Sequence, residues 1–399
     1  MNFKEEAAGL SDYIVEKRRW IHSHAEVSFE ERDTTAYITK ELESMGIETQ
    51  RFPDYYGVIG TIRGEKPGKT VMLRADIDAL PLNEGSGEAF SSCNPGAMHA
   101  CGHDCHSAML LGAARMLSSH LEGLCGTVKL LFQSAEESCH GANYYVDHGY
   151  LDDVDALMGI HVWASMETGF INIEDGFRMA SCDNFKIIVE GSSVHGSTPH
   201  LGHDAIVAAS SIIMNIQTFV SRENDPLNPM VVSVGMVKAG TQFNIIADRV
   251  EMEGTIRTYG VEMRKKVQKE LGRIIGGTAE ALGCRAEFIN NPIEPPVMND
   301  DLELNEIARA AAVKLYGEEV LKKMPRVMGS EDMSILMEKV PGLLCFIGYY
   351  NEECGSVHPV HSVHFRVDEK LLPRGAALYA QFAYDYLEGG EVEEEGKSL

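Results

Sequence analysis

The sequence lacks the features of a secreted, membrane-spanning or nucleic-acid-binding protein. It begins without an apolar signal core and contains no apolar run of membrane-spanning length. It contains 35 lysines and arginines but 60 aspartates and glutamates, which gives a formal net charge of −25. The sequence shows no basic patch that could bind nucleic acid or an anionic membrane. Its nine cysteines are an odd number without the spacing of a disulfide framework. We therefore expect a cytoplasmic protein in a reducing compartment, with neither nucleic acid nor a membrane as partner.

The length and composition favour a globular protein of two domains. A chain of 399 residues is too long for one ordinary core. Apolar residues make up 44% and charged residues 24%, as in soluble globular proteins. No internal repeat is visible. The last residues, 388–399, are polar and acidic, which predicts a flexible tail.

Helical and strand patterns alternate in the first part of the chain. We expect helices over 4–22, 31–45 and 106–120, and buried strands over 71–75, 128–132 and 156–160. Polar side chains follow each strand, namely Asp76 with Asp78, then Glu136 with Glu137, then His161. This layout predicts an α/β domain with a doubly wound, mixed sheet and one active edge.

A different order follows between residues 182 and 291. We expect strands over 185–190, 230–237, 249–258 and 285–289, with helices over 204–221 and 263–282. This β-α-β-β-α-β order predicts an inserted ferredoxin-like α+β domain. The catalytic domain would then comprise residues 1–181 and 292–387, the second part ending in a helix over 369–387.

One short segment is rich in metal-binding side chains. Residues 98–106 contain three histidines and two cysteines, which suit a borderline-soft divalent metal. With residues from other strand ends, the candidate ligands are Cys101, His103, Glu137, His161 and His361. Two tetrahedral metals need about eight bonds, and these five groups supply them if the Cys101 thiolate and a water both bridge. Zinc or manganese is the expected metal pair, with cobalt or nickel as alternatives.

The Glu136–Glu137 pair divides into two roles. Neighbouring residues in an extended chain point apart, so Glu137 can bind metal while Glu136 acts as general base on a shared hydroxide. Asp78 can orient a ligand histidine, and Asp76 competes for that role.

Each of these residue types also has a simpler, structural interpretation. A lone buried histidine or cysteine, such as His106, Cys93 or Cys125, is usually structural, and an adjacent pair of glutamates is usually a solvated turn. A purely structural zinc site uses a closed, local set of ligands, whereas these candidates run from residue 101 to residue 361. Their joint appearance at strand ends favours a hydrolytic site.

These residues resemble a known family over residues 10–387. The chain is similar to the metal-dependent amidohydrolases and carboxypeptidases related to aminoacylase, hippurate hydrolase, auxin-conjugate hydrolases and N-acetyl-diaminopimelate deacetylase. The resemblance lies in residues 74–81, 99–106, 135–137, 159–163, 329–332 and 358–362. It implies the same five ligands, Glu136 as base, and an inserted dimerisation or lid domain.

The resemblance also supplies residues in the inserted domain. His195 is similar to a histidine that reaches across a dimer to polarise the scissile carbonyl. Asn244 and Arg257 are similar to residues that hold the substrate carboxylate or the oxyanion; taken alone, Arg257 would be a surface charge on a strand. One departure is Ser134, where such relatives usually have proline.

The expected activity is cleavage of N-acyl amino acids to acid and free amino acid by a homodimer formed through the inserted domain. A dipeptidase or carboxypeptidase is the alternative enzyme. A metal-holding binding protein without turnover is the alternative from another class, although binding alone needs no base at Glu136. The sequence leaves the acyl group and the metal open.

Overall fold

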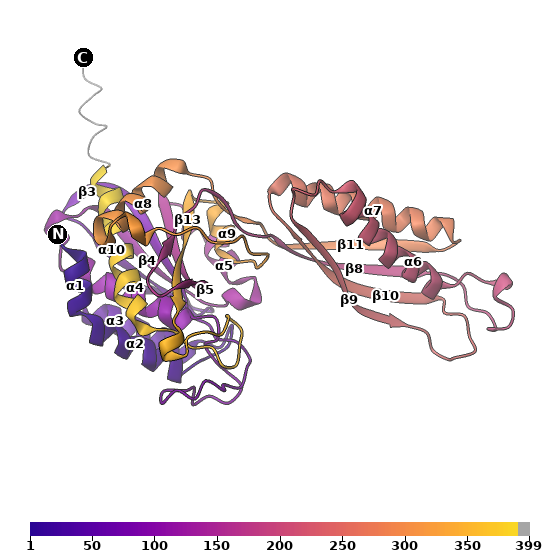
Figure 1. The fold of residues 1–399 in the computed structure, drawn as a ribbon, viewed down its shortest axis with the longest axis horizontal. Helices are drawn as coiled ribbons and strands as arrows, with labels where there is room; N and C mark the ends of the chain where they lie inside the picture. The colour runs from indigo at the N-terminus through magenta and orange to yellow at the C-terminus, as the bar shows by residue number, and fades with distance from the viewer. Residues whose placement is uncertain (390–399) are drawn as a thin grey trace, which may run out of the picture. The chain divides into compact units, whose positions relative to one another are not determined.

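The computed structural model describes residues 1–389, which form two compact units (Figure 1). The first unit comprises residues 1–178, 298–325 and those from Asp332 onward. The second comprises residues 179–297 and 326–331, and the expected insertion at 182–291 falls within it. The acidic tail expected over 388–399 lies, from residue 390 on, outside the described residues.

A seven-stranded mixed sheet forms the centre of the first unit, in the order β1-β2-β4-β3-β5-β13-β6. Its four inner strands, β4 to β13, run parallel, and antiparallel strands lie at both sides. The strand bounds are β1 Glu48–Arg51, β2 Gly57–Arg63, β3 Lys66–Asp76, β4 Cys125–Gln133, β5 Ala156–Glu167, β6 Ile171–Asn172 and β13 Gly342–Tyr350.

The expectation that His161 lies just past a strand end is wrong. β5 continues through His161 to Glu167 because β13 pairs with it as far as the Tyr350–Glu167 pair, so the extended backbone still has a hydrogen-bonded neighbour. His161 therefore stands within a strand and is buried.

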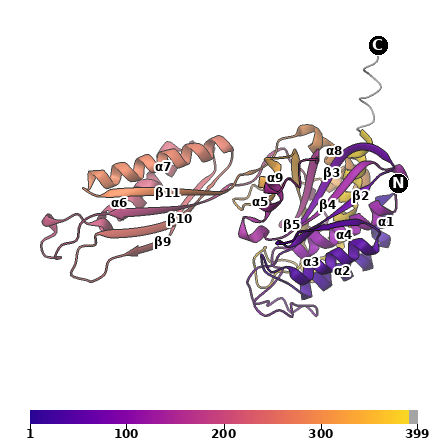
Figure 2. The same cartoon turned by 180° about the vertical axis from the view of Figure 1, so that it is seen from behind.

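Helices cover both faces of this sheet (Figure 2). Helices α4 and α10 pack against β3 on one face, where Leu73 joins their common core. Gly159 of β5 pairs with Arg74, the residue after Leu73, and therefore points to the opposite face of the sheet. On that face, a Cβ added to Gly159 would contact Met333 of α9. The helix bounds are α1 Phe3–Gly9, α2 Ser11–Ser23, α3 Arg32–Ser44, α4 His103–Ser118, α5 Gly141–Asp147, α8 Leu302–Tyr316, α9 Met333–Met337 and α10 Leu372–Glu388.

Two helix boundaries differ from the expectation. The helix expected over 4–22 is two helices, because the first ends at the cap residue Leu10. α4 starts at His103 rather than residue 106, after Gly102 turns the chain at a φ of 92°. A Cβ on Gly102 would lie 2.3 Å from Val162, so both the backbone angle and the space require glycine there.

The second unit has the ferredoxin-like order. Its four-stranded sheet, β11-β8-β10-β9, is antiparallel throughout, and α6 and α7 pack on one face around a separate apolar core (Figure 1). The bounds are β8 Cys182–Glu190, α6 Ala205–Thr218, β9 Met230–Ala239, β10 Arg249–Thr258, α7 Val261–Ala281 and β11 Arg285–Glu294. The short strands β7 (Gly176–Met179) and β12 (Val297–Asn299) lie where the chain passes between the units.

Within the described residues, one stretch is long and apolar enough to cross a membrane by length and composition alone, Ala205–Glu223. It contains α6, whose inner side packs in the core of the second unit through residues such as Ile212 and Ile216.

A buried ion pair joins three helical segments of the first unit. The Arg18 guanidinium donates to Asp104 Oδ2 at 2.7 Å and to Glu369 Oε1 at 3.0 Å, and His22 Nδ1 lies 2.8 Å from the same Asp104 oxygen. Burial favours a raised pKa for Asp104, but Arg18 and His22 hold that pKa well below its usual range. The pair therefore fixes α2 against the start of α4, directly beside the cysteine- and histidine-rich segment.

We expect Arg18→Ala to lower the free energy of unfolding by about 3–5 kcal/mol, because it leaves the buried Asp104 charge without its guanidinium partner and with only His22 beside it. Arg19→Ala is the matched control, since Arg19 binds the same Glu369 with a side chain that is 49% exposed. Urea unfolding followed by the fluorescence of Trp20, which stacks on Tyr37 in this region, measures both variants. Equal losses in the two variants would contradict a dominant role for the buried pair.

Candidate active site

The candidate site lies at the carboxyl ends of the parallel strands of the first unit. β3 ends at Asp76, and its neighbour β4 ends just before Glu136 and Glu137. β5 lies on the other side of β3 and supplies His161, while α4 begins at His103. The chain leaves β3 toward β4 and leaves the neighbouring strand β5 toward β13, in the opposite direction, and such a point is where open α/β sheets place their ligands.

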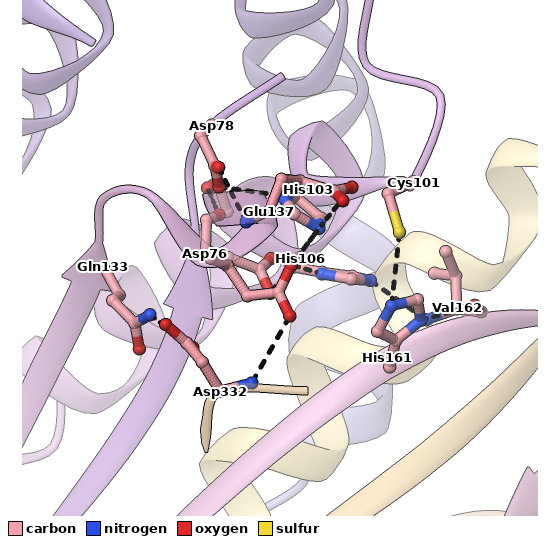
Figure 3. A network of polar contacts seen from close by, with 12 residues as sticks. Asp76, Asp78, Cys101, His103, His106, Gln133, Glu137, His161, Val162 and Asp332 are labelled. Carbon is pink, nitrogen blue, oxygen red and sulfur yellow. Dashed lines mark hydrogen bonds and ion pairs between the residues drawn. The ribbon is translucent and has the colours of Figure 1, made fainter. Parts of the chain in front are cut away.

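Three of the five expected ligands form one group (Figure 3). The ligand atoms of Cys101, His103 and His161 all lie within 4.8 Å of one another, and the Cys101 sulfur is 3.5 Å from His161 Nε2. All three residues are buried. His161 Nδ1 lies 2.7 Å from the carbonyl oxygen of Val162, which leaves Nε2 directed at the group.

The remaining two ligands form a second group that shares Cys101. Cys101, Glu137 and His361 also lie within 4.8 Å of one another, and His361 Nε2 is 3.4 Å from Glu137 Oε1. His361 is held in a left-handed conformation, with a φ of 66°, and its N–H donates to the Ala100 carbonyl at 2.7 Å. That hydrogen bond places His361 beside Cys101, although the two residues are far apart in the sequence.

The donor atoms fit a pair of metal ions. His103 Nε2 and Glu137 Oε1 are buried, make no hydrogen bond, and lie 3.9 Å apart. Ligand atoms at about 2.1 Å from a tetrahedral ion stand roughly 3.4 Å from one another, close to the separations seen here. The two triads share the Cys101 sulfur, and a thiolate that bridges two ions stays a prediction. Thiolate, imidazole and carboxylate together suit borderline divalent metals.

The structure separates the contacts of Asp78 from those of Asp76. Asp78 Oδ1 lies 3.2 Å from His103 Nδ1, so the other ring nitrogen of His103 faces the metal group. Asp78 Oδ2 accepts the Glu137 N–H at 3.0 Å. Asp76 lies 2.6 Å from His106 Nδ1 and pairs with Arg74, and its Oδ2 comes within 3.8 Å of the other ring nitrogen of His103, Nε2. Asp78 is therefore the carboxylate placed to orient His103.

Glu136 belongs to neither of these two triads, but it forms a further group with His103 and Glu137 whose atoms could also hold a metal ion. Its Oε2 is 3.8 Å from His103 Nε2, and its Oε1 accepts the N–H of Asp332 at 3.4 Å. The Asp332 carboxylate in turn accepts from the Gln133 amide (Figure 3). It also accepts from Arg74 and from the Ala142 N–H. The sequence resemblance included segment 329–332 but gave it no role. The structure places its last residue, Asp332, in contact with the candidate base Glu136.

His106 is a residue whose position the sequence did not explain. Its ring bonds Asp76 through Nδ1 and accepts the Val162 N–H through Nε2 at 3.0 Å. It therefore links the end of β3 to β5 beside His161. Its spacing of three residues from His103 on one helix face was the available signal.

Electrostatics of the metal-free site favour a bound proton on His103 and Cys101 but disfavour a second proton on His161. Burial lowers the pKa of His103, but Asp76 and Asp78 outweigh it and raise that pKa to about 10. Burial, with Glu137 next, raises the pKa of Cys101 well above its usual value. Burial, together with His106, lowers the pKa of His161 well below its usual value. Cations bound at the site would oppose the effect of the carboxylates and lower the pKa values of His103 and Cys101. Both residues bind metal in their deprotonated forms.

The other three candidates lie in the second unit. His195 follows β8 in an exposed loop, with Nδ1 2.7 Å from the Ser197 hydroxyl, and the Gly196 N–H donates to the Asn244 carbonyl. Arg257 lies on β10 and donates to the Ser330 hydroxyl at 2.8 Å. The structure thus brings His195 and Asn244 together and places Arg257 elsewhere in this unit.

Comparison with known proteins identifies the family. The sequence model of peptidase family M20/M25/M40 matches residues 72–385. The chain belongs to this family. It is 38% identical to the N-acetylcysteine deacetylase of Bacillus subtilis, over 94% of this chain and 97% of that protein. It is 37% identical to thermostable carboxypeptidase 2 of Saccharolobus solfataricus, over 96% of this chain and 98% of that protein.

A solved structure agrees with this assignment. A dinuclear metal-binding peptidase of the M20 family from Bacillus subtilis superposes with a TM-score of 0.85 at 35% identity, over 96% of this chain and 99% of that one. This M20-family chain is a metal-dependent hydrolase of amide bonds. The two overlapping triads and the dinuclear neighbour together support two divalent ions.

We expect metal binding to tighten by at least about tenfold per pH unit between pH 6.5 and 8.5, because His103 and Cys101 must each lose a proton. Competition with a chromophoric chelator, starting from metal-free protein, measures the affinity at each pH. Cys101→Ser should bind more weakly and with a slope reduced by about one proton. An affinity that does not change with pH would contradict this protonation of the metal-free ligands.

Proposed function

We propose that this M20-family protein hydrolyses N-acyl amino acids, releasing a carboxylic acid and a free amino acid. The observation that supports this proposal is Glu136, a carboxylate next to two metal-binding triads but outside both. A binding protein has no use for such a base, whereas amide hydrolysis needs a group that takes a proton from water and delivers it to the leaving nitrogen.

The residues of this chain divide the remaining work. Cys101, His103, Glu137, His161 and His361 would hold the ions, and Asp78 would orient His103. When bound, the metal pair lowers the pKa of water and polarises the scissile carbonyl. Glu136 accepts the proton of the attacking water and passes it to the amide nitrogen, an effect typically worth ~10²–10⁴ in rate. Zinc or manganese is the proposed pair.

Peptide hydrolysis is the second candidate activity. The carboxypeptidase and the deacetylase are almost equally similar to this chain, at 37% and 38% identity, so similarity alone favours neither. Both reactions break an amide beside an amino-acid carboxylate, which Arg257 could hold with two parallel hydrogen bonds.

A substrate panel with a base variant tests the reaction. We expect metal-restored protein to release amino acid from N-acetyl, N-benzoyl or indole-acetyl amino acids, and chelated protein to release none. Glu136→Gln should lose at least about 10²-fold in kcat while keeping its metal content, measured by elemental analysis. Release from dipeptides alone would favour the peptidase. Full activity in Glu136→Gln would remove that residue as the base.

The second unit suggests that one site uses residues of two chains. The His195 loop lies beyond the Arg249 end of β10, where the Val194 carbonyl accepts from Ile246 and Glu190 pairs with Arg249. Arg257 lies at the opposite end, a rise of about 27 Å along an antiparallel strand at ~3.4 Å per residue. That span is far longer than an N-acyl amino acid. If both side chains contact one substrate, they come from different copies.

An exposed apolar surface is available for such pairing. β9 is the edge strand of the second sheet and exposes Val231, Met236 and Val237. The outer side of α6 exposes Val207 and Met214. A long edge strand with apolar side chains is a ready surface for another strand, which supports a homodimer through this unit.

Complementation tests the shared site. We expect His195→Ala to lose about 10²–10³-fold in kcat with unchanged metal content, as for loss of an oxyanion donor. Mixed dimers of His195→Ala and Glu136→Gln subunits should regain activity, because one of their two sites would combine an intact base with an intact His195. Mixtures that stay as inactive as the single variants, with mixed dimers demonstrated by mass, would contradict the shared site.

A further inference from the structure

The turn that carries Glu136 and Glu137 has an unfavourable backbone conformation. β4 ends at Gln133, and two residues later Ala135 has a φ of 62°, in the left-handed region. That region is disfavoured for every residue with a Cβ, so surrounding contacts must hold it. Glu136 and Glu137 follow directly, and their directions depend on this one residue.

A buried glutamate from a distant segment holds the turn. The Ala135 N–H donates to Glu31 Oε1 at 2.8 Å, across 104 residues of sequence. Glu31 lies just before α3 and is fully buried. A carboxyl in such a place is costly to bury, and its pKa is raised to about 7 by burial and by the nearby Asp78. Either protonation state keeps an oxygen that can accept this bond.

Other contacts hold the carbonyl side of the turn. The Ala135 carbonyl accepts from the Ser138 hydroxyl at 2.7 Å and from the Gly141 N–H at 3.2 Å. A Cβ on Gly141 would lie 2.1 Å from the Ser134 carbonyl oxygen, so the closeness of this packing requires glycine. Among these contacts, Glu31 is the one that fixes the Ala135 amide.

A second hydrogen bond, at Ser134, holds the turn where relatives usually have proline. A proline there would restrict the turn through its ring, but it could not donate a hydrogen bond. Ser134 instead donates its N–H to the Tyr145 hydroxyl at 3.3 Å. In this chain the turn is set by hydrogen bonds to Tyr145 and Glu31.

We propose that Glu31 is a positioning residue for hydrolysis: its buried carboxyl fixes the Ala135 amide and so aims Glu136 at the attacking water. This inference rests on the proposed role of Glu136 as base. Glu31 is neither one of the five candidate ligands nor the candidate base, and it acts through the backbone of the turn. A displacement of about 1 Å at a catalytic group can lower the rate by ~10²-fold.

Three variants separate this role from general stability. Glu31→Ala removes the acceptor, Glu31→Gln keeps a carbonyl oxygen at the same place, and Glu30→Ala removes the neighbouring exposed carboxylate. On an amide substrate that the parent protein hydrolyses, we expect Glu31→Ala to lose about 10–100-fold in kcat per folded molecule, with KM changed less than about threefold. Glu31→Gln should regain most of that loss, and Glu30→Ala should match the parent protein.

Hydrogen exchange on metal-free protein gives a readout independent of activity. Peptides covering residues 134–137 should exchange faster in Glu31→Ala and stay protected in Glu31→Gln. The proposal is overturned if exchange and kcat are unchanged in Glu31→Ala, or if Glu31→Gln loses as much kcat as Glu31→Ala. Glu136→Gln, assayed alongside, shows separately whether Glu136 is the base: its full activity would remove the base on which this inference rests, whatever Glu31 does.

Discussion

The Asp78 carboxylate connects the segments on which the candidate site depends. One oxygen faces His103 Nδ1, and the other accepts from the Glu137 N–H and, at 2.6 Å, from the Ser28 hydroxyl. A ligand on α4, the ligand-bearing turn after β4 and the N-terminal segment are thereby fixed to one buried group. A site for two ions needs ligand atoms placed within a few tenths of an ångström, and a shared carboxylate can impose that placement before metal arrives.

The region behind the ligands is also charged rather than apolar. Asp104, one residue after His103, is paired with Arg18 and His22, and His22 Nε2 lies 3.1 Å from Glu84. Such pairs are costly to desolvate and very costly to break, so they add little to stability but strongly resist rearrangement. The start of α4 is held from behind by these charges, while Asp78 holds it from the side.

The two units contribute different chemistry. The first unit holds the ligand groups and the candidate base in a preorganised arrangement that is largely buried except at His361, which suits a centre where charge develops in a small volume. The second unit has a simple antiparallel sheet with polar candidates at opposite ends. The two ends of β10 are too far apart for His195 and Arg257 of one chain to contact the same small molecule. A role for both residues in one site therefore requires a second copy of the chain.

The sequence by itself determined the residue types and their order. The cluster at 98–106, the Glu136–Glu137 pair and the β-α-β-β-α-β pattern follow from local spacing and hydrophobic periodicity, which depend on neighbours in the chain. Only the tertiary structure decided which residues meet. His361 reaches Cys101 through the Ala100 carbonyl, Asp78 rather than Asp76 contacts His103 Nδ1, and Glu31 holds Ala135. These contacts join segments far apart in sequence, and one hydrogen bond between distant residues leaves no periodic signal in a single chain.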